Sequence, residues 1–364
     1  MKIINVVGTR PNFMKIAPII KEMDKYSEID HLLIHTGQHY DLKLSTNFFT
    51  ELGIPEPDIN LNIGSGSPTL QVAKIMEAFE NICDEHAPDL VLVVGDVNST
   101  MACTLVAAQK KIKVVHVEAG IRSYDRNMLE ETNRLVTDSI ANYLLPPSFD
   151  AVENLKREGH SEEKIECVGN VMIDTLKLFQ PQVEKATVLE DWNITKGNYV
   201  AFTLHRPSNV DNKKNLQSIF KAIQIIQKNV KVVFPIHPRT KKMIASYGLE
   251  NKLESMNNLV LTPPLGYLDF GKLVSNSKYV LTDSGGIQEE TTVYGIPCIT
   301  LRENTERPIT IEIGTNVLAG CDTNKILSYV EKINKNEWKS GKTPELWDGK
   351  AAQRIVKFIR NITF

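Results

Sequence analysis

Short runs of Val, Ile and Leu alternate along this chain with segments in which apolar residues recur every three or four positions. The runs are almost continuously apolar, as strands buried on both faces of a sheet must be. Strands that alternate with helices favour a parallel sheet covered by helices on both faces, so we expect a doubly wound α/β fold. The predicted strands are Ile3–Val7, His31–His35, Leu90–Val94, Val114–Val117, Ile165–Val168, Tyr199–Thr203, Lys231–Pro235, Leu259–Thr262, Tyr279–Thr282 and Cys298–Leu301.

Helical spacing is clearest in a stripe of apolar side chains between the second and third predicted strands. The stripe consists of Val72, Ile75, Met76, Phe79, Ile82 and Cys83. Further helices are predicted at Asn215–Lys228, Leu268–Ser275 and Gly286–Val293. A shorter stripe near the end contains Ile355, Phe358 and Ile359 and predicts a C-terminal helix.

The length of 364 residues suggests two domains, because one hydrophobic core seldom serves so long a chain. Between the two series of strands lies Gln180–Lys196, which lacks a strand pattern. We therefore predict an N-terminal domain at 1–175 and a C-terminal domain at 176–350. The final helix, 351–364, is expected to pack back on the N-terminal domain.

The overall charge excludes some partner classes. A formal net charge of −2 favours neither nucleic acid nor an anionic membrane as a partner. The five cysteines are widely spaced and form no CxxC motif, which is typical of reduced residues in a reducing compartment. The apolar stretch at the start is too short for a signal peptide, so we expect a cytoplasmic protein.

Charged residues follow the predicted strands of the first half. Arg10 and Lys15 come after the first strand, where Arg10 and free helix amides would bind an anion. Asp96 and Glu118 each end a later strand, and Glu130 follows closely in sequence. Carboxylates gathered at one sheet edge shift each other's pKa values, which separates an acid from a base.

Each of these acids also has a purely structural interpretation. Asp96 would serve equally as a helix cap, and Arg122 is a candidate partner for Glu118. Arg134 lies four residues after Glu130, so the two would form a surface pair.

The second half supplies cationic and small residues at its strand ends. His205 and His237 each follow a strand, in equivalent positions. Ser284, Gly285 and Gly286 then lead from a strand into a helix, where small residues let a phosphate approach the backbone amides. Other candidate ligands of a nucleotide are Glu290, for a ribose diol, and Arg307, for a phosphate.

Several cofactor sites are missing from the sequence. The first strand is not followed by GxGxxG, and the second ends in His35-Thr36-Gly37-Gln38 without an acidic residue for a ribose. We therefore expect no bound NAD. There is no phosphate-binding lysine motif of the Walker type and no His/Cys cluster with metal-ligand spacing, so we expect no metal.

Six short segments together resemble the non-hydrolysing UDP-N-acetylglucosamine 2-epimerases over nearly the whole chain. They are GTRPNFMK at 8–15, GDVNST at 95–100, HVEAGIRS at 116–123, EETNR at 130–134, DSGGIQEE at 283–290 and TERP at 305–308. The resemblance implies the GT-B fold, in which two Rossmann-like domains hold a nucleotide sugar in the cleft between them. It also implies a homodimer, and activation of some members by their own substrate.

The same resemblance implies a role for each matching residue. Asp96, Glu118 and Glu130 match catalytic acids, and His205 matches a histidine near the reacting sugar and diphosphate. The matching substrate ligands are Arg10, Lys15, Phe270 beside the uracil, Ser284, Gly285 and Gly286 at the diphosphate, Glu290 at the ribose and Arg307, to which we add His237.

Two residues and one short segment depart from the family pattern. Leu129 replaces a proline found in many members, and Leu265 replaces a glutamine found near uracil in some. Residues 37–41, GQHYD, differ from the loop that forms the regulatory site of the best-known branch. Related branches act on UDP-sugars with other substituents, so the sugar and its regulation stay open.

The resemblance predicts C2 inversion of a UDP-linked N-acetylated amino sugar. Because the C2 proton is not next to a carbonyl, we expect UDP to leave carbon 1 as that proton is removed. A glycal would form, and UDP and a proton would then add back on the opposite face. Arg10, His205, Arg307 and the helix start at Ser284 would stabilise the departing diphosphate. The alternatives are a 2-epimerase of a modified UDP-HexNAc such as a diacetamido uronic acid, a GT-B glycosyltransferase, a hydrolysing epimerase and a UDP-sugar sensor.

Overall fold

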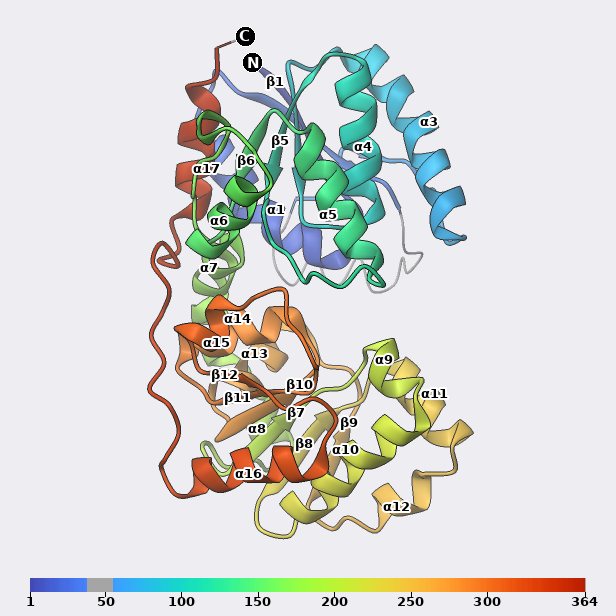
Figure 1. Cartoon of the computed structure of the whole chain (residues 1–364), viewed down its shortest axis with the longest axis vertical. Helices are drawn as coiled ribbons and strands as arrows, with labels where there is room; N and C mark the ends of the chain where they lie inside the picture. The colour runs from blue at the N-terminus through green and yellow to red at the C-terminus, as the bar shows by residue number, and fades with distance from the viewer. Residues whose placement is uncertain (38–54, 364) are drawn as a thin grey trace. The chain divides into compact units, whose positions relative to one another are not determined.

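The computed structural model describes residues 1–37 and 55–363, which form two compact units (Figure 1). The first contains Met1–Leu178 and Glu345–Phe364, and the second contains Phe179–Pro344. The chain passes from the first unit into the second within helix α7 (Val171–Lys185).

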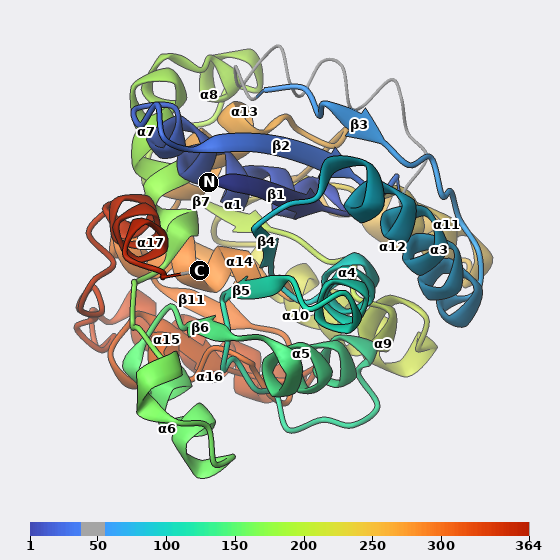
Figure 2. The same cartoon turned by 90° about the horizontal axis from the view of Figure 1, so that it is seen from above.

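The first unit contains a parallel sheet of six strands in the order β3-β2-β1-β4-β5-β6. Helices α3, α4 and α5 pack against one another on one face, and α1 packs against α17 on the other (Figure 2). The elements are β1 (Lys2–Val7), α1 (Arg10–Met23), β2 (Asp30–His35), β3 (Ile59–Asn60), α3 (Pro68–His86), β4 (Leu90–Val94), α4 (Asn98–Gln109), β5 (Lys113–Val117), α5 (Leu129–Ile140), β6 (Tyr143–Leu145), α6 (Phe149–Arg157), η1 (Glu162–Lys164), α7 and α17 (Ala351–Arg360).

One predicted strand of this unit is wrong. Ile165–Val168 forms only an isolated bridge between Ile165 and Leu144. The sixth strand is instead β6, which the sequence did not predict and which is only three residues long. Strands as short as β3 and β6 contain too few residues for a pattern to stand out.

The C-terminal segment belongs to the first unit. Ile355 and Ile359 of α17 are fully buried, and Phe358 packs edge-on against Tyr143 of β6 with ring centroids 5.4 Å apart. Asp174 of α7 holds the start of α17, because its carboxylate accepts hydrogen bonds from the backbone amides of Ala351 (3.0 Å) and Ala352 (2.8 Å).

The second unit repeats the same topology in a sheet of order β12-β11-β10-β7-β8-β9, again entirely parallel. The predicted strands of this half are all present, and the three-residue strand β12 is additional. The elements are α8 (Val188–Asp191), β7 (Tyr199–Phe202), α9 (Pro207–Val210), α10 (Lys213–Ile226), β8 (Lys231–Pro235), α11 (Pro238–Ser246), α12 (Glu250–Glu254), β9 (Leu259–Thr262), α13 (Tyr267–Ser275), β10 (Tyr279–Thr282), α14 (Gly285–Tyr294), β11 (Cys298–Thr300), α15 (Ile309–Glu312), β12 (Asn316–Leu318) and α16 (Thr323–Asn334).

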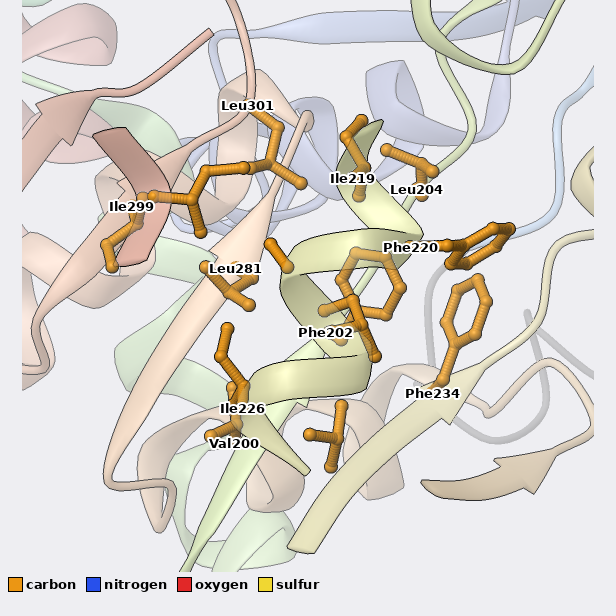
Figure 3. Close-up of a cluster of buried hydrophobic side chains, with 14 of the residues drawn as sticks. Val200, Phe202, Leu204, Ile219, Phe220, Ile226, Phe234, Leu281, Ile299 and Leu301 are labelled. Carbon is orange, nitrogen blue, oxygen red and sulfur yellow. The ribbon is translucent and has the colours of Figure 1, made fainter. Parts of the chain in front are cut away.

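Buried aromatic side chains join α10 to this second sheet (Figure 3). The rings of Phe202 on β7 and Phe234 on β8 lie 4.4 Å apart, and Phe220 of α10 lies 6.4 Å from Phe202. All three are fully buried, so each contributes on the order of 2–3 kcal/mol by removal from water. This packing fixes the carboxyl ends of β7 and β8, from which the predicted histidines extend.

Both sheets have a topological switch point, where strand order reverses and where ligands of open α/β sheets bind. In the first unit it lies between β1 and β4, and in the second between β7 and β10. Strand order therefore brings the loop after β1 beside the Asp96 loop, and the His205 loop beside Ser284. No helix among the described residues is long and apolar enough to cross a membrane.

Candidate active site

A buried asparagine joins the two loops at the switch point of the first unit. The side-chain oxygen of Asn12 accepts hydrogen bonds from the amides of Gly8 (3.1 Å) and Thr9 (3.0 Å). Its side-chain nitrogen donates to the carbonyl of Val94 at the end of β4 (3.0 Å). Because these bonds connect β1 to β4, they hold the first turn of α1 beside the Asp96 loop.

Two of the predicted site residues contact each other here. The Lys15 ammonium donates to Oε2 of Glu118, and both side chains are nearly excluded from solvent. Burying two charges is costly unless they are paired, and this contact supplies the pairing. Oε1 of Glu118 is also buried but has no hydrogen-bond partner. Lys15, rather than Arg122, is therefore the partner of Glu118, and one carboxylate oxygen remains available.

The backbone at Glu118 is unusual. Its φ angle is +70°, in a region that residues other than glycine seldom adopt. This conformation costs on the order of 1–3 kcal/mol. Such conformations cluster at functional sites. The angle turns the chain immediately after β5, at the sheet edge where Asp96 also lies.

Asp96 does not cap α4, whose N-cap residue is Val97. Its carboxylate instead contacts Nε of Arg134 at 3.2 Å, and its backbone carbonyl accepts from the Asn133 side chain at 2.9 Å. Arg134 also donates to Glu131 at 2.7 Å. The predicted surface pair of Arg134 with Glu130 is wrong, since the buried arginine binds Asp96 and Glu131 instead.

The adjacent glutamates of α5 have different surroundings. Glu131 is buried and accepts hydrogen bonds from the amides of Ser123 and Tyr124, both at 2.9 Å, so it holds the loop after Glu118. Glu130 is only partly buried on the first turn of α5. Arg10 is exposed at the first position of α1.

Asp283 organises the switch point of the second unit, a role that the sequence did not predict. It is fully buried at the end of β10, and its carboxylate accepts from the backbone amides of His205 (3.1 and 3.0 Å) and Arg206 (2.8 Å). Its Oδ1 also lies 3.2 Å from Nδ1 of His205. Burial alone would raise the pKa of Asp283, but these bonds and the charge of His205 lower it. The ionised carboxylate thus fixes the position of the histidine ring.

The second predicted histidine lies close by. The rings of His205 and His237 are 5.8 Å apart. His237 is the N-cap residue of α11 and accepts a hydrogen bond at Nδ1 from the amide of Arg239 (3.2 Å). Burial, together with the charges of His205 and Arg239, lowers the pKa of His237.

Two adjacent glycines begin α14 after its N-cap residue Ser284, and their surroundings differ. A Cβ atom on Gly285 would lie 2.5 Å from Oε1 of Glu306, whereas a Cβ on Gly286 would meet nothing within 4 Å. Gly285 is therefore needed for packing inside the unit. Gly286 faces open space at the positive end of a ten-residue helix, where an anion would bind.

Arg307 lies behind this helix start and contacts two carboxylates. Its Nε is 2.6 Å from Glu289, and its Nη1 is 2.8 Å from Glu306, which in turn pairs with Arg302. Burial alone would raise the pKa of Glu306, but Arg307 and Arg302 hold it well below its usual range. The resulting network balances its charges and fixes the arginine in place.

Glu290 and Phe270 complete the predicted nucleotide residues. Burial and the neighbouring carboxylate of Glu289 raise the pKa of Glu290 to about 7. Phe270 of α13 is partly buried and, like Leu265, packs against a core that includes residues of α8, α13 and β10. Both lie on helices that flank the switch-point strands.

A family model described as UDP-N-acetylglucosamine 2-epimerase matches residues 21–360 of this chain. The chain is 44% identical, over the full length of both proteins, to a UDP-N-acetylglucosamine 2-epimerase homolog of Methanococcus maripaludis. It is 35% identical over both full lengths to the UDP-2,3-diacetamido-2,3-dideoxy-D-glucuronate 2-epimerase of Pseudomonas aeruginosa. Its fold matches that of Methanocaldococcus jannaschii UDP-GlcNAc 2-epimerase, solved with UDP-GlcNAc and UDP, with a TM-score of 0.89, 43% identity and 99% of both chains covered. This chain belongs to the UDP-N-acetylglucosamine 2-epimerase family.

As a member of the epimerase family, the chain has the expected GT-B-like fold of two Rossmann-like units. The structure brings Lys15, Glu118 and the Asp96 loop together in the first unit, and His205, His237 and the α14 start together in the second. Across residues 1–37 and 55–363, no group of three His, Cys, Asp or Glu side chains is arranged to hold a metal ion. Residues 38–41 of the divergent loop lie outside the described part of the chain.

Three residues that hold the predicted site residues of this epimerase-family chain in place were not predicted from the sequence. Asn12, Glu131 and Asp283 all lie inside motifs quoted above, yet their roles depend on partners far away in sequence. A signal for Asp283 existed, because a carboxylate directly after a buried apolar strand needs compensating donors.

Proposed function

We propose that this protein interconverts UDP-N-acetylglucosamine and UDP-N-acetylmannosamine by inverting carbon 2 of the sugar. The proposal rests on the place of the candidate residues: the carboxylates of the first unit and the start of α14 lie at the switch points of their sheets. The chain that carries them is 43% identical to an enzyme solved with UDP-GlcNAc and UDP. The family to which the chain belongs supports isomerase chemistry.

We propose that the second unit holds the nucleotide. The amides at Ser284, Gly285 and Gly286 and the positive end of α14 would bind the diphosphate. Arg307 acts from a fixed position behind them, since two carboxylates already orient it. His205 and His237 lie on the neighbouring loops, and Glu290 would accept hydrogen bonds from the ribose hydroxyls.

Phe270 lies on α13, where its ring would pack beside the uracil. This placement is supported by the partial burial of Phe270, because part of its side chain stays exposed and available to a base. Arg10 is exposed at the start of α1 and is a further proposed cationic ligand of the substrate.

The reaction begins as one carboxylate takes the proton from carbon 2. The C–H electron pair forms a double bond between carbons 1 and 2, and the bond from carbon 1 to the diphosphate oxygen breaks. Cations and helix amides stabilise the negative charge that develops on UDP. A second carboxylic acid then delivers a proton to the opposite face of carbon 2, and the UDP oxygen re-forms its bond to carbon 1. Atoms and charges balance without an oxidant.

Asp96, Glu118 and Glu130 are the proposed proton-transfer groups. Glu118 has one oxygen paired with Lys15 and a second without a partner, so the second is free to exchange a proton. The Asp96 carboxylate is oriented by Arg134, and Glu130 is partly exposed. Each general acid or base of this kind contributes on the order of 100- to 10,000-fold.

The experiment is a single incubation with UDP-GlcNAc in deuterated water, without added NAD, metal or acceptor, followed by proton NMR. We expect a second UDP-HexNAc to appear, with deuterium at carbon 2 in both sugars and no accumulation of free UDP. Product without deuterium would refute the elimination route. Free UDP with free sugar would identify a hydrolysing enzyme, and turnover only after an acceptor is added would identify a glycosyltransferase.

A second candidate substrate is the UDP-linked 2,3-diacetamido uronic acid, supported by the 35% identical Pseudomonas aeruginosa enzyme. The higher identity to UDP-GlcNAc 2-epimerases favours UDP-GlcNAc. Comparison of kcat/KM for the two UDP-sugars decides between them. We also propose that the protein is cytoplasmic and forms a homodimer, in keeping with family members. Light scattering on the purified protein tests the dimer.

A further inference from the structure

His116 is completely buried near the end of β5, two residues before Glu118. Both nitrogens of its ring have a close oxygen partner. Nδ1 lies 2.6 Å from Oδ1 of Asp138 on α5, and Nε2 lies 2.8 Å from the backbone carbonyl of Gly95. Gly95 directly precedes Asp96, so the ring reaches the backbone that carries a proposed catalytic acid.

Both partners of the ring can only accept a hydrogen bond. A backbone carbonyl has no proton to donate. The other oxygen of Asp138 accepts from the amide of Gly120 (3.0 Å) and lies 2.6 Å from Nη2 of Arg122. Burial alone would raise the pKa of Asp138, but the surrounding charges and hydrogen bonds lower it, and two of them, Arg122 and the Gly120 amide, do not involve the ring. Each ring nitrogen therefore faces a hydrogen-bond acceptor, and this geometry favours a proton on both.

The surrounding charges make a buried imidazolium acceptable. Arg122 pairs with Asp138 and also with Glu158, the residue that follows α6. The Glu158 carboxylate accepts hydrogen bonds from Nε (2.7 Å) and Nη2 (2.6 Å) of Arg122. The four groups contain two positive and two negative charges, so the cluster is neutral as a whole. A buried charge that is both paired and hydrogen-bonded avoids most of the desolvation cost.

The hydrogen bond to the Gly95 carbonyl sets the direction of the following residue. Gly95 has a φ angle of +74°, and a Cβ there would lie 3.2 Å from both Nζ of Lys15 and Nδ2 of Asn12. The turn is therefore packed against the Lys15–Glu118 pair on one side and bonded to His116 through its carbonyl. Gly95 is thus held through its carbonyl and by its packing, which fixes the backbone direction from which the Asp96 side chain leaves.

We propose that His116 is a doubly protonated positioning residue, which holds the Gly95–Asp96 peptide and thereby aims the Asp96 carboxylate. The imidazolium acts through Gly95 and does not itself touch the substrate. The proposed effect on turnover rests on the proposed function, whereas the protonation state of the ring is independent of it.

The first test reads the ring directly, in the wild-type protein. Histidine labelled with ¹⁵N is incorporated, and His116 is assigned as the signal that disappears in H116F. We expect two N–H protons and two protonated nitrogen shifts for this ring at pH 7.5, with or without turnover of UDP-GlcNAc. A single protonated nitrogen would overturn the proposal.

The second test compares kcat and KM among three variants. In H116F the bond to Gly95 is lost, and we expect kcat to fall roughly 100-fold, as misplacement of a reacting group does, with KM changed less than about threefold. In D138N the amide oxygen still accepts from Arg122 and Gly120, while the amide nitrogen donates to Nδ1. The ring is then neutral but still bonded to Gly95, so we expect a smaller fall of roughly 10-fold.

V115A is the matched control, because Val115 is equally buried on β5. It should lower the melting temperature while kcat stays within about twofold of wild type. If V115A lost as much kcat as H116F at a similar loss of melting temperature, the positioning role would be refuted. Full kcat in D138N would overturn the requirement for a doubly protonated ring. Failure of the wild type to epimerise any UDP-HexNAc would instead count against the proposed function.

Discussion

Substitution of Gly286 by alanine should stabilise the free protein while weakening substrate binding. Gly286 is the second residue of α14, and an added Cβ would have no heavy atom within 4 Å. No clash opposes the substitution in the absence of ligand. We propose that the open space beside this residue is where the diphosphate approaches the helix amides.

The expected sizes of the two effects follow from separate interactions. Alanine is favoured over glycine in a helix by up to about 1 kcal/mol, which for a unit of this size raises the melting temperature by roughly 2–4 °C. A hydrogen bond from a backbone amide to a charged group contributes about 1.5–3 kcal/mol, so its loss weakens binding roughly 10- to 150-fold.

The assay combines thermal unfolding without ligand and titration calorimetry with UDP. Gly285→Ala is the matched control, since the same methyl group there would lie 2.5 Å from Glu306 and must displace it. We expect that control to lower the melting temperature. Unchanged UDP affinity in a stable Gly286→Ala protein would refute the assignment of the diphosphate to this helix start.

Three further outcomes are expected. Asp283→Asn should lower both the melting temperature and kcat, because an amide nitrogen would replace an oxygen that accepts from buried backbone amides. The control, Asp211→Asn at an exposed ion pair, should change neither property by much. Glu131→Gln should lower the melting temperature, because it removes a charged acceptor of two backbone amides. Glu130→Gln should leave the melting temperature unchanged and lower kcat on the order of 100-fold or more. Equal effects of the two variants on both properties would contradict these separate roles. The fold raises the pKa of Glu290 from 4.5 to about 7. Its contribution to stability is therefore complete below pH 4.5 and is lost as the pH rises through 7. Glu290→Gln should accordingly be more stable than wild type at pH 8 but not at pH 4. Affinity for UDP-GlcNAc, whose diphosphate does not titrate in this range, should rise from pH 6 to 8 in the wild type only.

The sequence by itself determined the fold class. Strands that are covered on both faces must be apolar along their whole length, so runs such as Leu90–Val94 and Tyr279–Thr282 stand out without any structure. β3, β6 and β12 were missed because two or three residues form no recognisable pattern. Ile165–Val168 has the composition of a strand but makes only a bridge, since pairing depends on the neighbour and not on composition alone.

The sequence also indicated which residues end the strands, and therefore which side chains reach the functional edge of each sheet. It did not indicate their partners. Lys15 and Glu118 are far apart in the chain, and they meet because only one strand, β4, separates β1 from β5 in the sheet. His205 and Asp283 meet because β7 lies beside β10. Strand order decides these contacts, and strand order is a property of the folded sheet. Only the tertiary structure therefore distinguishes a carboxylate that is bound on both oxygens from one, such as Glu118, that keeps an oxygen without a partner.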